Sequence, residues 1–171
     1  MLARVASAAV LGIDAYLVDV ETDIAAGLPS FATVGLPHGA VKEGRERVNS
    51  AIQNAGFTFP LARITVNLAP ADVRKDGSAF DLPIALGILA ASDQIRLDAL
   101  KGWLVFGELG LDGEIRPVRG ALSMAALAAQ AGCAGVILPE ANVREAAVME
   151  GLDVRGARTL ADVVGHVGRG P

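Results

Sequence analysis

The chain has 171 residues, of which 52% are hydrophobic and 20% are charged, and its mean hydropathy is +0.44. This composition supports a buried core and excludes a disordered chain. The formal net charge of −4 excludes a uniformly basic protein that coats nucleic acid, so only a local patch could contact phosphate. The single cysteine excludes an internal disulfide, and we expect a soluble protein of the cytoplasm that has no membrane partner.

Alternating apolar residues predict the first elements of the chain. Two strands, ARVASAAVLG and DAYLVDVETDI, should form an antiparallel pair around Gly12. A third strand is expected in SFATVGLP, followed by an amphipathic helix in GAVKEGRERVNSAIQNAG that ends at Gly56. The strand ARITVNLAP comes next and leads into the loop ADVRKDGS.

Helices and strands alternate again in the second part of the chain. LPIALGILAAS predicts a buried helix, and GWLVFGELGL with GEIRPV predicts a hairpin across Asp112 and Gly113. Further helices are expected in ALSMAALAAQAG, EANVREAAVMEG and TLADVVGHV, with a buried strand in GVILP and an edge strand in LDVRGA. The sequence therefore predicts an α/β fold. It forms either one domain over residues 1–167 or two tightly packed halves of about 1–70 and 71–167, and residues 168–171 have a linker-like composition.

The segment KDGSAFD places a serine near a lysine at the start of a predicted helix, which is an arrangement found in serine–lysine peptidases. Such a dyad needs a lysine that gives up its proton readily, and the nearby Asp72 and Asp76 disfavour this for Lys75. Ser78 can instead form a capping box with Asp81, or a turn if the helix begins nearer Asp81, as Pro83 in the first turn favours. Capping or turn formation is therefore the favoured role of Ser78.

Signatures of cofactor sites are missing from the sequence. The chain contains no GxxxxGK[ST] phosphate-binding motif, and the glycines of GELGLDG are typical of a turn. His38 and His166 are far apart in the chain and have none of the spacing of metal ligands. We therefore expect neither a cofactor nor a metal ion in this chain.

Three blocks of the sequence carry a family resemblance. FATVGLPHGAVKEGRERVNSAI, ITVNLAPADVRKDGSAFDLPIALGIL and FGELGLDGEIRPVRGAL together resemble the N-terminal region of the magnesium-chelatase-like AAA+ ATPases of the ComM/YifB type. The likeness runs over nearly the whole chain, and the blocks occur in the order found in the family. That region is similar in turn to the proteolytic domain of Lon and the C-terminal domain of RadA. The resemblance thus implies a Lon-protease-like, ribosomal protein S5 domain 2-like fold with mixed sheets packed by helices.

The resemblance to Lon also shows where peptidase chemistry would lie. Lon peptidases carry Lys-Asp-Gly-Pro-Ser-Ala-Gly in the block that begins at Lys75, and the ungapped register puts Ala79 at the position of the nucleophile. The second block puts Leu122 at the position of the dyad lysine. Arg119, the nearest polar residue there, cannot act as a base because its guanidinium stays protonated. The resemblance therefore implies a peptidase-like domain without peptidase chemistry.

For the whole protein, the resemblance implies a hexameric, ATP-driven DNA helicase that acts in branch migration during natural transformation and homologous recombination. The AAA+ module, with its ATP and Mg sites, is absent from this chain. The expected role of the chain is to support ring assembly and DNA handling by that module. Its expected partners are its own AAA+ module, further copies of the same chain, and single-stranded or branched DNA.

The basic residues of one region are the candidates for DNA contact or for contact between subunits. Residues 42–75 hold six basic and three acidic residues, whereas residues 1–23 hold one basic and four acidic ones. The candidates are Lys42, Arg45, Arg47, Arg74 and Lys75.

Two alternatives stay open at this stage. The spacing of Glu43 with Arg47 and of Lys42 with Glu46 is that of ion pairs on one helix, and the acidic N-terminal strands could meet the basic cluster of a neighbouring copy. The chain could then be a pure protein-interaction or oligomerisation module without DNA binding. The second, less favoured alternative is a peptidase that uses Ser78 with Lys75 or Lys101.

Overall fold

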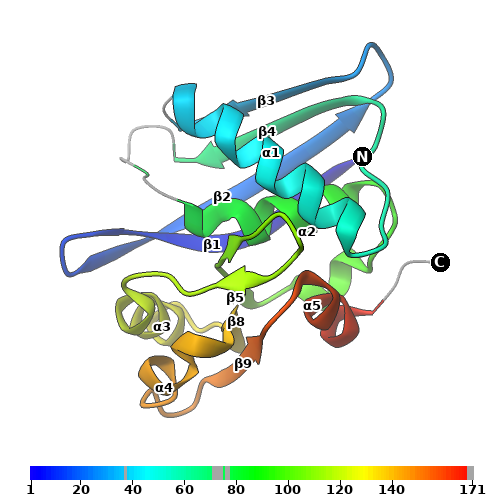
Figure 1. The fold of residues 1–171 in the computed structure, drawn as a ribbon. Coiled ribbons are helices and arrows are strands. Elements are labelled where there is room, and N and C mark those ends of the chain that lie inside the picture. Colours follow the sequence, from blue (N-terminus) through cyan, green and yellow to red (C-terminus); the bar gives the residue numbers. More distant parts are fainter. Residues whose placement is uncertain (37, 71–74, 76–77, 169–171) are drawn as a thin grey trace.

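The computed structural model describes residues 1–36, 38–70, 75 and 78–168. These residues form an α/β fold built on a seven-stranded mixed sheet with the strand order β3-β4-β2-β1-β5-β8-β9. A separate two-stranded sheet pairs β6 with β7. In Figure 1 the N-terminal strands form the upper part of the sheet, and β5, β8 and β9 form its lower part. The predicted α/β class is confirmed.

The elements follow the predicted order along the chain. The strands are β1 (Leu2–Leu11), β2 (Asp14–Ala25), β3 (Ser30–Val34), β4 (Arg63–Ala69), β5 (Trp103–Val105), β6 (Glu108–Leu109), β7 (Ile115–Arg116), β8 (Gly135–Pro139) and β9 (Asp153–Ala157). The α-helices are α1 (His38–Asn54), α2 (Asp81–Ala91), α3 (Ala121–Gln130), α4 (Val143–Ala146) and α5 (Leu160–Val167). Three 3₁₀ turns are η1 (Ser78–Phe80), η2 (Leu97–Leu100) and η3 (Glu140–Asn142).

Strand β1 lies in the middle of the sheet and has very different partners on its two sides. All ten of its residues pair with β2 in an antiparallel hairpin, which turns at Gly12 with a φ of 65°. On its other side β1 pairs with β5 in parallel at one position, Ala6 with Leu104. The remaining neighbours pair more fully: β4 is antiparallel to β2, while β3 with β4, β5 with β8, and β8 with β9 are parallel.

The main core lies on the face of the sheet that α1 and α2 cover (Figure 1). Buried and exposed residues alternate along β2 and β4, as expected for strands with one solvated face. All eleven residues of α2 are buried. The helix packs so closely on β2 that a Cβ atom at Gly87 would lie 2.5 Å from Thr22 Oγ1.

A second core lies on the opposite face of the sheet. Helix α3 packs there against β2, β1 and β8, and α4 packs against α3 and β9, with Phe106 and Met124 among the fully buried side chains. Helix α5 instead joins the main core, and its start carries a complete capping box between Thr159 and Asp162. Among the described residues, no helix combines the length and the apolar content that crossing a membrane requires.

Two predicted elements differ from those observed. The stretch GWLVFGELGL is not one strand. The Gly107 N–H donates to the Ala79 carbonyl at 2.9 Å, and this bond separates β5 from β6. The predicted hairpin is therefore reduced to the short pair of β6 and β7. The helix expected in EANVREAAVMEG is reduced to η3 and α4, since the chain has to turn back at Gly151, with a φ of 76°, to enter β9.

Candidate functional site

A pocket of about 570 Å³ lies where the two sequence blocks of the peptidase resemblance meet. Its lining comes from β1 and the β1–β2 turn, from η1, and from the segment that leads into α3. These residues are Ala8, Ala9, Val10, Gly12, Ser78, Ala79, Pro117, Val118, Arg119 and Met124. Leu122 is not part of the lining; it lies in the first turn of α3 and is 44% exposed.

One wall of the pocket is fixed by main-chain hydrogen bonds to Gly107. The Gly107 N–H donates to the Ala79 carbonyl, and the Leu82 N–H donates to the Gly107 carbonyl at 3.0 Å. Helix α2 begins directly after this turn, so the expected start near Asp81 with Pro83 in the first turn is confirmed. Of the two roles expected for Ser78, turn formation is confirmed, because Ser78 begins the 3₁₀ turn η1. The capping box is wrong: Phe80 occupies the N-cap position without a side-chain cap, and other groups bind the Asp81 carboxylate.

A second part of the lining is held by the side chain of Asn142. Its Oδ1 accepts from the Val118 N–H, and its Nδ2 donates to the Val118 carbonyl, both at 3.0 Å. Nδ2 also donates to Glu145 Oε1 at 2.8 Å. Asn142 is only 4% exposed, and its amide takes the place that a neighbouring strand would have beside Val118. The segment 117–119 is therefore rigidly positioned although it belongs to no helix or strand.

The chemistry of the pocket is limited by what lines it. Ser78 brings a hydroxyl and Arg119 an exposed guanidinium, while the other lining residues are apolar or glycine. A guanidinium keeps its proton and cannot activate a hydroxyl, so the lining residues that the structure describes offer no general base. Lys101, one of the bases considered for a peptidase, is exposed in the turn before β5 and does not line the pocket.

Lys75 is buried rather than displayed at the surface. The residue is 2% exposed, and its Nζ donates to the carbonyl of Pro70. In the described structure the Lys75 ammonium is therefore buried, and the DNA contact expected of it from the sequence stays a prediction. Arg74, another candidate for DNA contact, lies outside the described residues.

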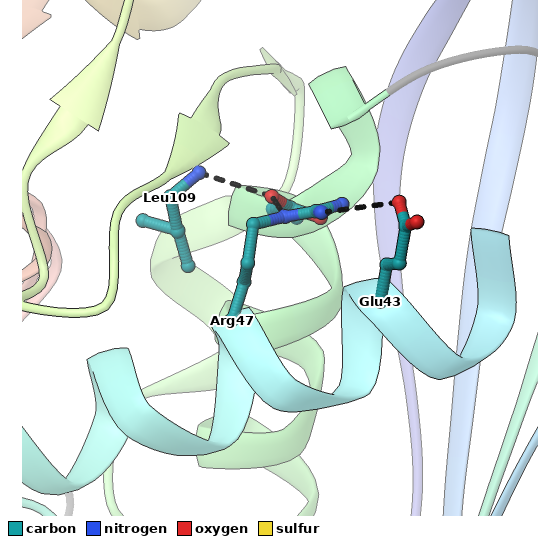
Figure 2. A network of polar contacts seen from close by, with 4 residues as sticks. Glu43, Arg47 and Leu109 are labelled. Atoms are coloured by element: carbon teal, nitrogen blue, oxygen red, sulfur yellow. Dashed lines mark hydrogen bonds and ion pairs between the residues drawn. The ribbon is translucent and has the colours of Figure 1, made fainter.

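Arg47 forms the central ion pair of the α1 cluster (Figure 2). Its Nε lies 2.7 Å from Asp81 Oδ2, and its Nη2 lies 3.2 Å from Asp81 Oδ1. Asp81 Oδ2 also accepts from the Leu109 N–H at 3.1 Å, and Glu43 Oε2 lies 3.9 Å from Arg47 Nη1. Arg47 thus links α1 to the start of α2 and, through Asp81, to β6. Its positive charge is paired with Asp81 and Glu43 within the molecule.

Burial and charge act in opposite directions on this ion pair. Burial raises the pKa of Asp81, and this outweighs the lowering by the hydrogen bond from Arg47, by its charge and by the Leu109 N–H. The hydrogen bond to Asp81 raises the pKa of Arg47 further above its ordinary range. The Asp81 carboxylate therefore depends strongly on its three donors.

The outer charges of α1 are also largely paired. Arg45 Nη2 lies 3.5 Å from Glu46 Oε1, and both side chains are at least half exposed. The expected pair of Glu43 with Arg47 is present, whereas Glu46 pairs with Arg45 rather than with Lys42. Lys42 is exposed. The basic cluster read from the sequence is thus mostly neutralised in the described structure.

The solvated face of β2 carries the acidic residues of the N-terminal region. Asp19, Glu21 and Asp23 alternate with the buried residues of this strand. Arg4 Nε lies 3.1 Å from Glu21 Oε2, and Asn67 Nδ2 donates to Glu21 Oε1 at 2.9 Å. Among the described residues, no group of three or more His, Cys, Asp or Glu side chains is placed to hold a metal ion.

Sequence reasoning missed two residues that organise these sites. From the sequence, Asp81 is predicted only as a capping residue. It is an acidic residue at the start of a completely buried helix, and a buried charge of this kind requires a cationic partner. Asn142 had no signal at all, because its bonds to Val118 span 24 residues of sequence and join a side chain to the main chain.

Comparison with known proteins finds a matching family and several similar sequences. The sequence model of the family described as "Subunit ChlI of Mg-chelatase" matches residues 20–142. Competence protein ComM of Haemophilus influenzae is 48% identical over 163 residues, which cover 95% of this chain and 32% of ComM. Protein YifB of Escherichia coli is 44% identical over 150 residues, which cover 88% of this chain and 29% of YifB.

A more distant match concerns the peptidase resemblance. Lon protease homolog 2, a peroxisomal protein of Caenorhabditis elegans, is 34% identical over 109 residues, or 60% of this chain and 14% of the homolog. The chain spans about a third of the length of the ComM and YifB proteins that it matches. ComM and YifB are thus among its relatives, and because the family match covers well over half of its residues, the chain belongs to the magnesium-chelatase-like family defined by the ChlI subunit.

Proposed function

We propose that this chain is the non-catalytic, Lon-like N-terminal domain of a ComM/YifB-type AAA+ ATPase, and that it supports ring assembly and DNA handling by a branch-migration motor. The observation that carries the proposal is the pocket at the peptidase-like position, which has Ala79 where a nucleophile would lie and no base among its described lining residues. The likeness to ComM over 95% of the chain supports the same assignment. ATP and Mg²⁺ would act in the AAA+ module, and the full-length protein would be a homo-oligomer, with the hexamer as the expected form.

The absence of peptidase chemistry has a direct test. The 171-residue chain is incubated with fluorescent casein and, separately, with ATP, and a Ser78→Ala variant is measured beside it. We expect no hydrolysis of either substrate above a buffer control. Peptide hydrolysis that disappears in Ser78→Ala would overturn the non-catalytic assignment and restore the peptidase alternative.

The DNA part of the proposal rests on the two exposed cations of α1, Lys42 and Arg45. Binding of labelled single-stranded and branched DNA is measured over a salt series with a Lys42→Ala/Arg45→Ala variant. Arg47 is left intact because its removal would break the pair with Asp81. A matched control, Arg116→Ala/Arg144→Ala, removes two exposed cations on other elements.

Affinity that falls with salt and is lost in the α1 variant alone would support DNA handling by this domain. Equal losses in both variants would indicate non-specific attraction and argue against a DNA site on α1. The absence of binding at low salt, with the fold intact, would contradict the DNA role and leave ring assembly.

The ion pairs of α1 favour a second candidate, a pure protein-interaction or oligomerisation module. Arg45 and Arg47 already neutralise acidic side chains, which leaves little net positive charge on the helix for phosphate. Light scattering over a concentration series separates the candidates: self-association without DNA affinity supports the module, whereas DNA affinity by a monomer contradicts it.

A further inference from the structure

We propose that the free edge of β3 binds β3 of a second copy of this chain in an antiparallel pair, with Ala32 facing the partner subunit's Ala32 across a twofold axis. The contact joins the sheets of the two copies into one. A contact about a twofold axis links copies in pairs, whereas a hexameric ring can be closed by head-to-tail contacts. This surface is therefore additional to the one that ring assembly would use, and it does not depend on the DNA role.

The main-chain groups on one side of β3 are available for pairing. Strand β3 ends the seven-stranded sheet, and β4 is its one paired neighbour among the described residues (Figure 1). The Ser30 N–H donates to the Ala62 carbonyl at 3.2 Å, so Ser30 turns its main-chain groups towards β4. These groups alternate in direction along a strand, and those of Phe31 and Thr33 therefore point out of the sheet. The edge thus offers the N–H and carbonyl groups of both residues to an added strand.

The side chains of β3 leave this edge accessible. Ser30, Ala32 and Val34 are exposed and alternate with half-buried residues, and Val34 is 52% exposed. Leu28, two residues before the strand, is 88% exposed. The solvated face of β3 is therefore open and carries apolar surface at both ends of the strand.

The two outer strands of the sheet differ in how they are protected. Edge strands commonly carry charge, proline or a bulge that disfavours pairing with another chain. At the β9 edge, Asp153 and Arg155 form an ion pair at 3.2 Å, and Arg155 also lies over the Trp103 ring at 4.9 Å. Strand β3 reads SFATV and contains neither a charged residue nor a proline. The edge that lacks such protection is the one at β3.

The outward groups of β3 match a second copy of the same strand. With Ala32 on the twofold axis, Phe31 faces the partner subunit's Thr33, and Thr33 faces the partner subunit's Phe31. Facing residues of this kind exchange both of their N–H···O bonds in an antiparallel pair, so every outward group of Phe31 and Thr33 finds a partner. The register is therefore self-complementary.

The side chains also fit this register. Ala32 and its counterpart form the pair without hydrogen bonds, in which the Cα atoms are about 4.5 Å apart and side chains come closest. Two methyl groups fit this gap, and no charge opposes the contact. Val34 would lie opposite the partner subunit's Ser30 and near the partner subunit's Leu28, so apolar surface is buried at both ends of the pair.

The first experiment measures the oligomeric state of the 171-residue chain. Sedimentation velocity from about 1 μM to 1 mM covers moderate and weak affinities, and we expect a concentration-dependent equilibrium of monomer and dimer. Hydrogen exchange followed by NMR locates the contact. The amides of Phe31 and Thr33 should exchange more slowly in the dimer, whereas those of Val154 and Gly156, on the β9 edge, should not change.

Charges placed on the twofold axis test the register. Ala32→Lys and Ala32→Glu each bring like charges face to face, so each variant alone should be monomeric at concentrations where the native chain is dimeric. An equal mixture of the two variants brings opposite charges together and should restore the dimer. Thr65→Lys is the matched control. Thr65 is the exposed register partner of Ala32 on β4, one strand inside the edge, and its substitution should leave the dimer unchanged.

Four results would overturn the proposal. The chain could stay monomeric up to about 1 mM. The mixture of Ala32→Lys and Ala32→Glu could stay monomeric, which would exclude this register. Ala32→Lys and Thr65→Lys could weaken the dimer equally, which would indicate general charge repulsion. Finally, dimer formation could slow exchange at Val154 and Gly156 instead, which would place the contact at the β9 edge.

Discussion

Arg47 of α1 and Asp81 of α2 form an ion pair with two contacts, 2.7 Å and 3.2 Å long, although the two residues are 34 positions apart in the chain. Arg47 is 24% exposed and Asp81 only 4%, so the carboxylate depends on the guanidinium more than the reverse. An arginine that the sequence places among the surface candidates is therefore part of the interior. This pair determines which variants of α1 can be used to study binding and which would destabilise the protein.

The first prediction concerns Arg47→Ala. The substitution leaves the buried Asp81 carboxylate without its ionic partner, and we expect it to lower the free energy of unfolding by about 3 kcal/mol. Urea denaturation followed by circular dichroism measures this loss. Arg45→Ala removes an exposed pair on the same helix and should cost less than about 0.5 kcal/mol. Equal effects of the two substitutions would contradict the structural role of Arg47.

The second prediction concerns the pH dependence of stability. Because the folded-state pKa of Asp81 lies above its ordinary value of 3.8, the folded protein binds this proton more tightly than the unfolded chain does. The stability that Asp81 contributes is thus fully present below pH 3.8 and is lost as the pH rises through the folded-state pKa. Asp81→Asn cannot titrate.

Comparison of these two proteins isolates the effect of Asp81. The free energy of unfolding of the native chain minus that of Asp81→Asn should fall as the pH is raised from below 3.8 towards neutrality. Urea titrations at a series of pH values measure this difference. A difference that rises with pH over this range would mean that the donors of Arg47 and Leu109 outweigh burial and lower the pKa instead.

The third prediction concerns the close contact between α2 and β2. A Cβ atom at Gly87 would lie 2.5 Å from Thr22 Oγ1 and 3.2 Å from Thr22 Cβ, in a region where Thr22 is completely buried. We expect Gly87→Ala to cost about 1–3 kcal/mol through overpacking, reduced by about 1 kcal/mol through the better helix propensity of alanine.

A double substitution tests the cause of that cost. Thr22→Ala removes the hydroxyl, which has no hydrogen-bond partner among the described residues, and so makes room for the added methyl group. Gly87→Ala should then cost less in the Thr22→Ala protein than in the native chain, although the Cβ of residue 22 remains 3.2 Å away, and a double-mutant cycle from thermal unfolding gives the coupling. Additive effects would show that the contact is not the source of the cost.

The fourth prediction concerns Asn142. Asn142→Ala leaves the Val118 N–H and carbonyl without their partners, and we expect a loss of about 2 kcal/mol in the free energy of unfolding. Asn142→Asp keeps an acceptor for the N–H but places a buried carboxylate against the Val118 carbonyl and Glu145 Oε1, which Nδ2 contacts at 2.8 Å, so its effect should be at least as large. The backbone amide NMR signals of Val118 and Arg119 should broaden in both variants. A normal spectrum for this segment in Asn142→Ala would contradict its positioning role.

Local patterns in the sequence were sufficient for much of the fold. The alternation in β1, β2 and β4 and the apolar run of α2 are signals within single elements, and the structure confirms them. The break at Gly107 could not be predicted, because it arises from a bond to Ala79, which is distant in the sequence. The charge pattern of α1 failed for the same reason: spacing along one helix reveals partners on that helix, whereas the strongest partner of Arg47 lies on α2.

The pairing of β1 has a consequence for how the chain could be divided. The ladder β3-β4-β2-β1 and the ladder β5-β8-β9 meet at the single pair of Ala6 with Leu104. Every strand of the first ladder precedes Lys101 in the sequence, and every strand of the second follows Gly102. The polypeptide can therefore be cut between these two residues into two contiguous fragments that each retain a complete ladder. Fragment complementation would then join the sheet at one strand junction and rebuild the shared core and the Gly107 bonds to Ala79 and Leu82, without any element having to be exchanged.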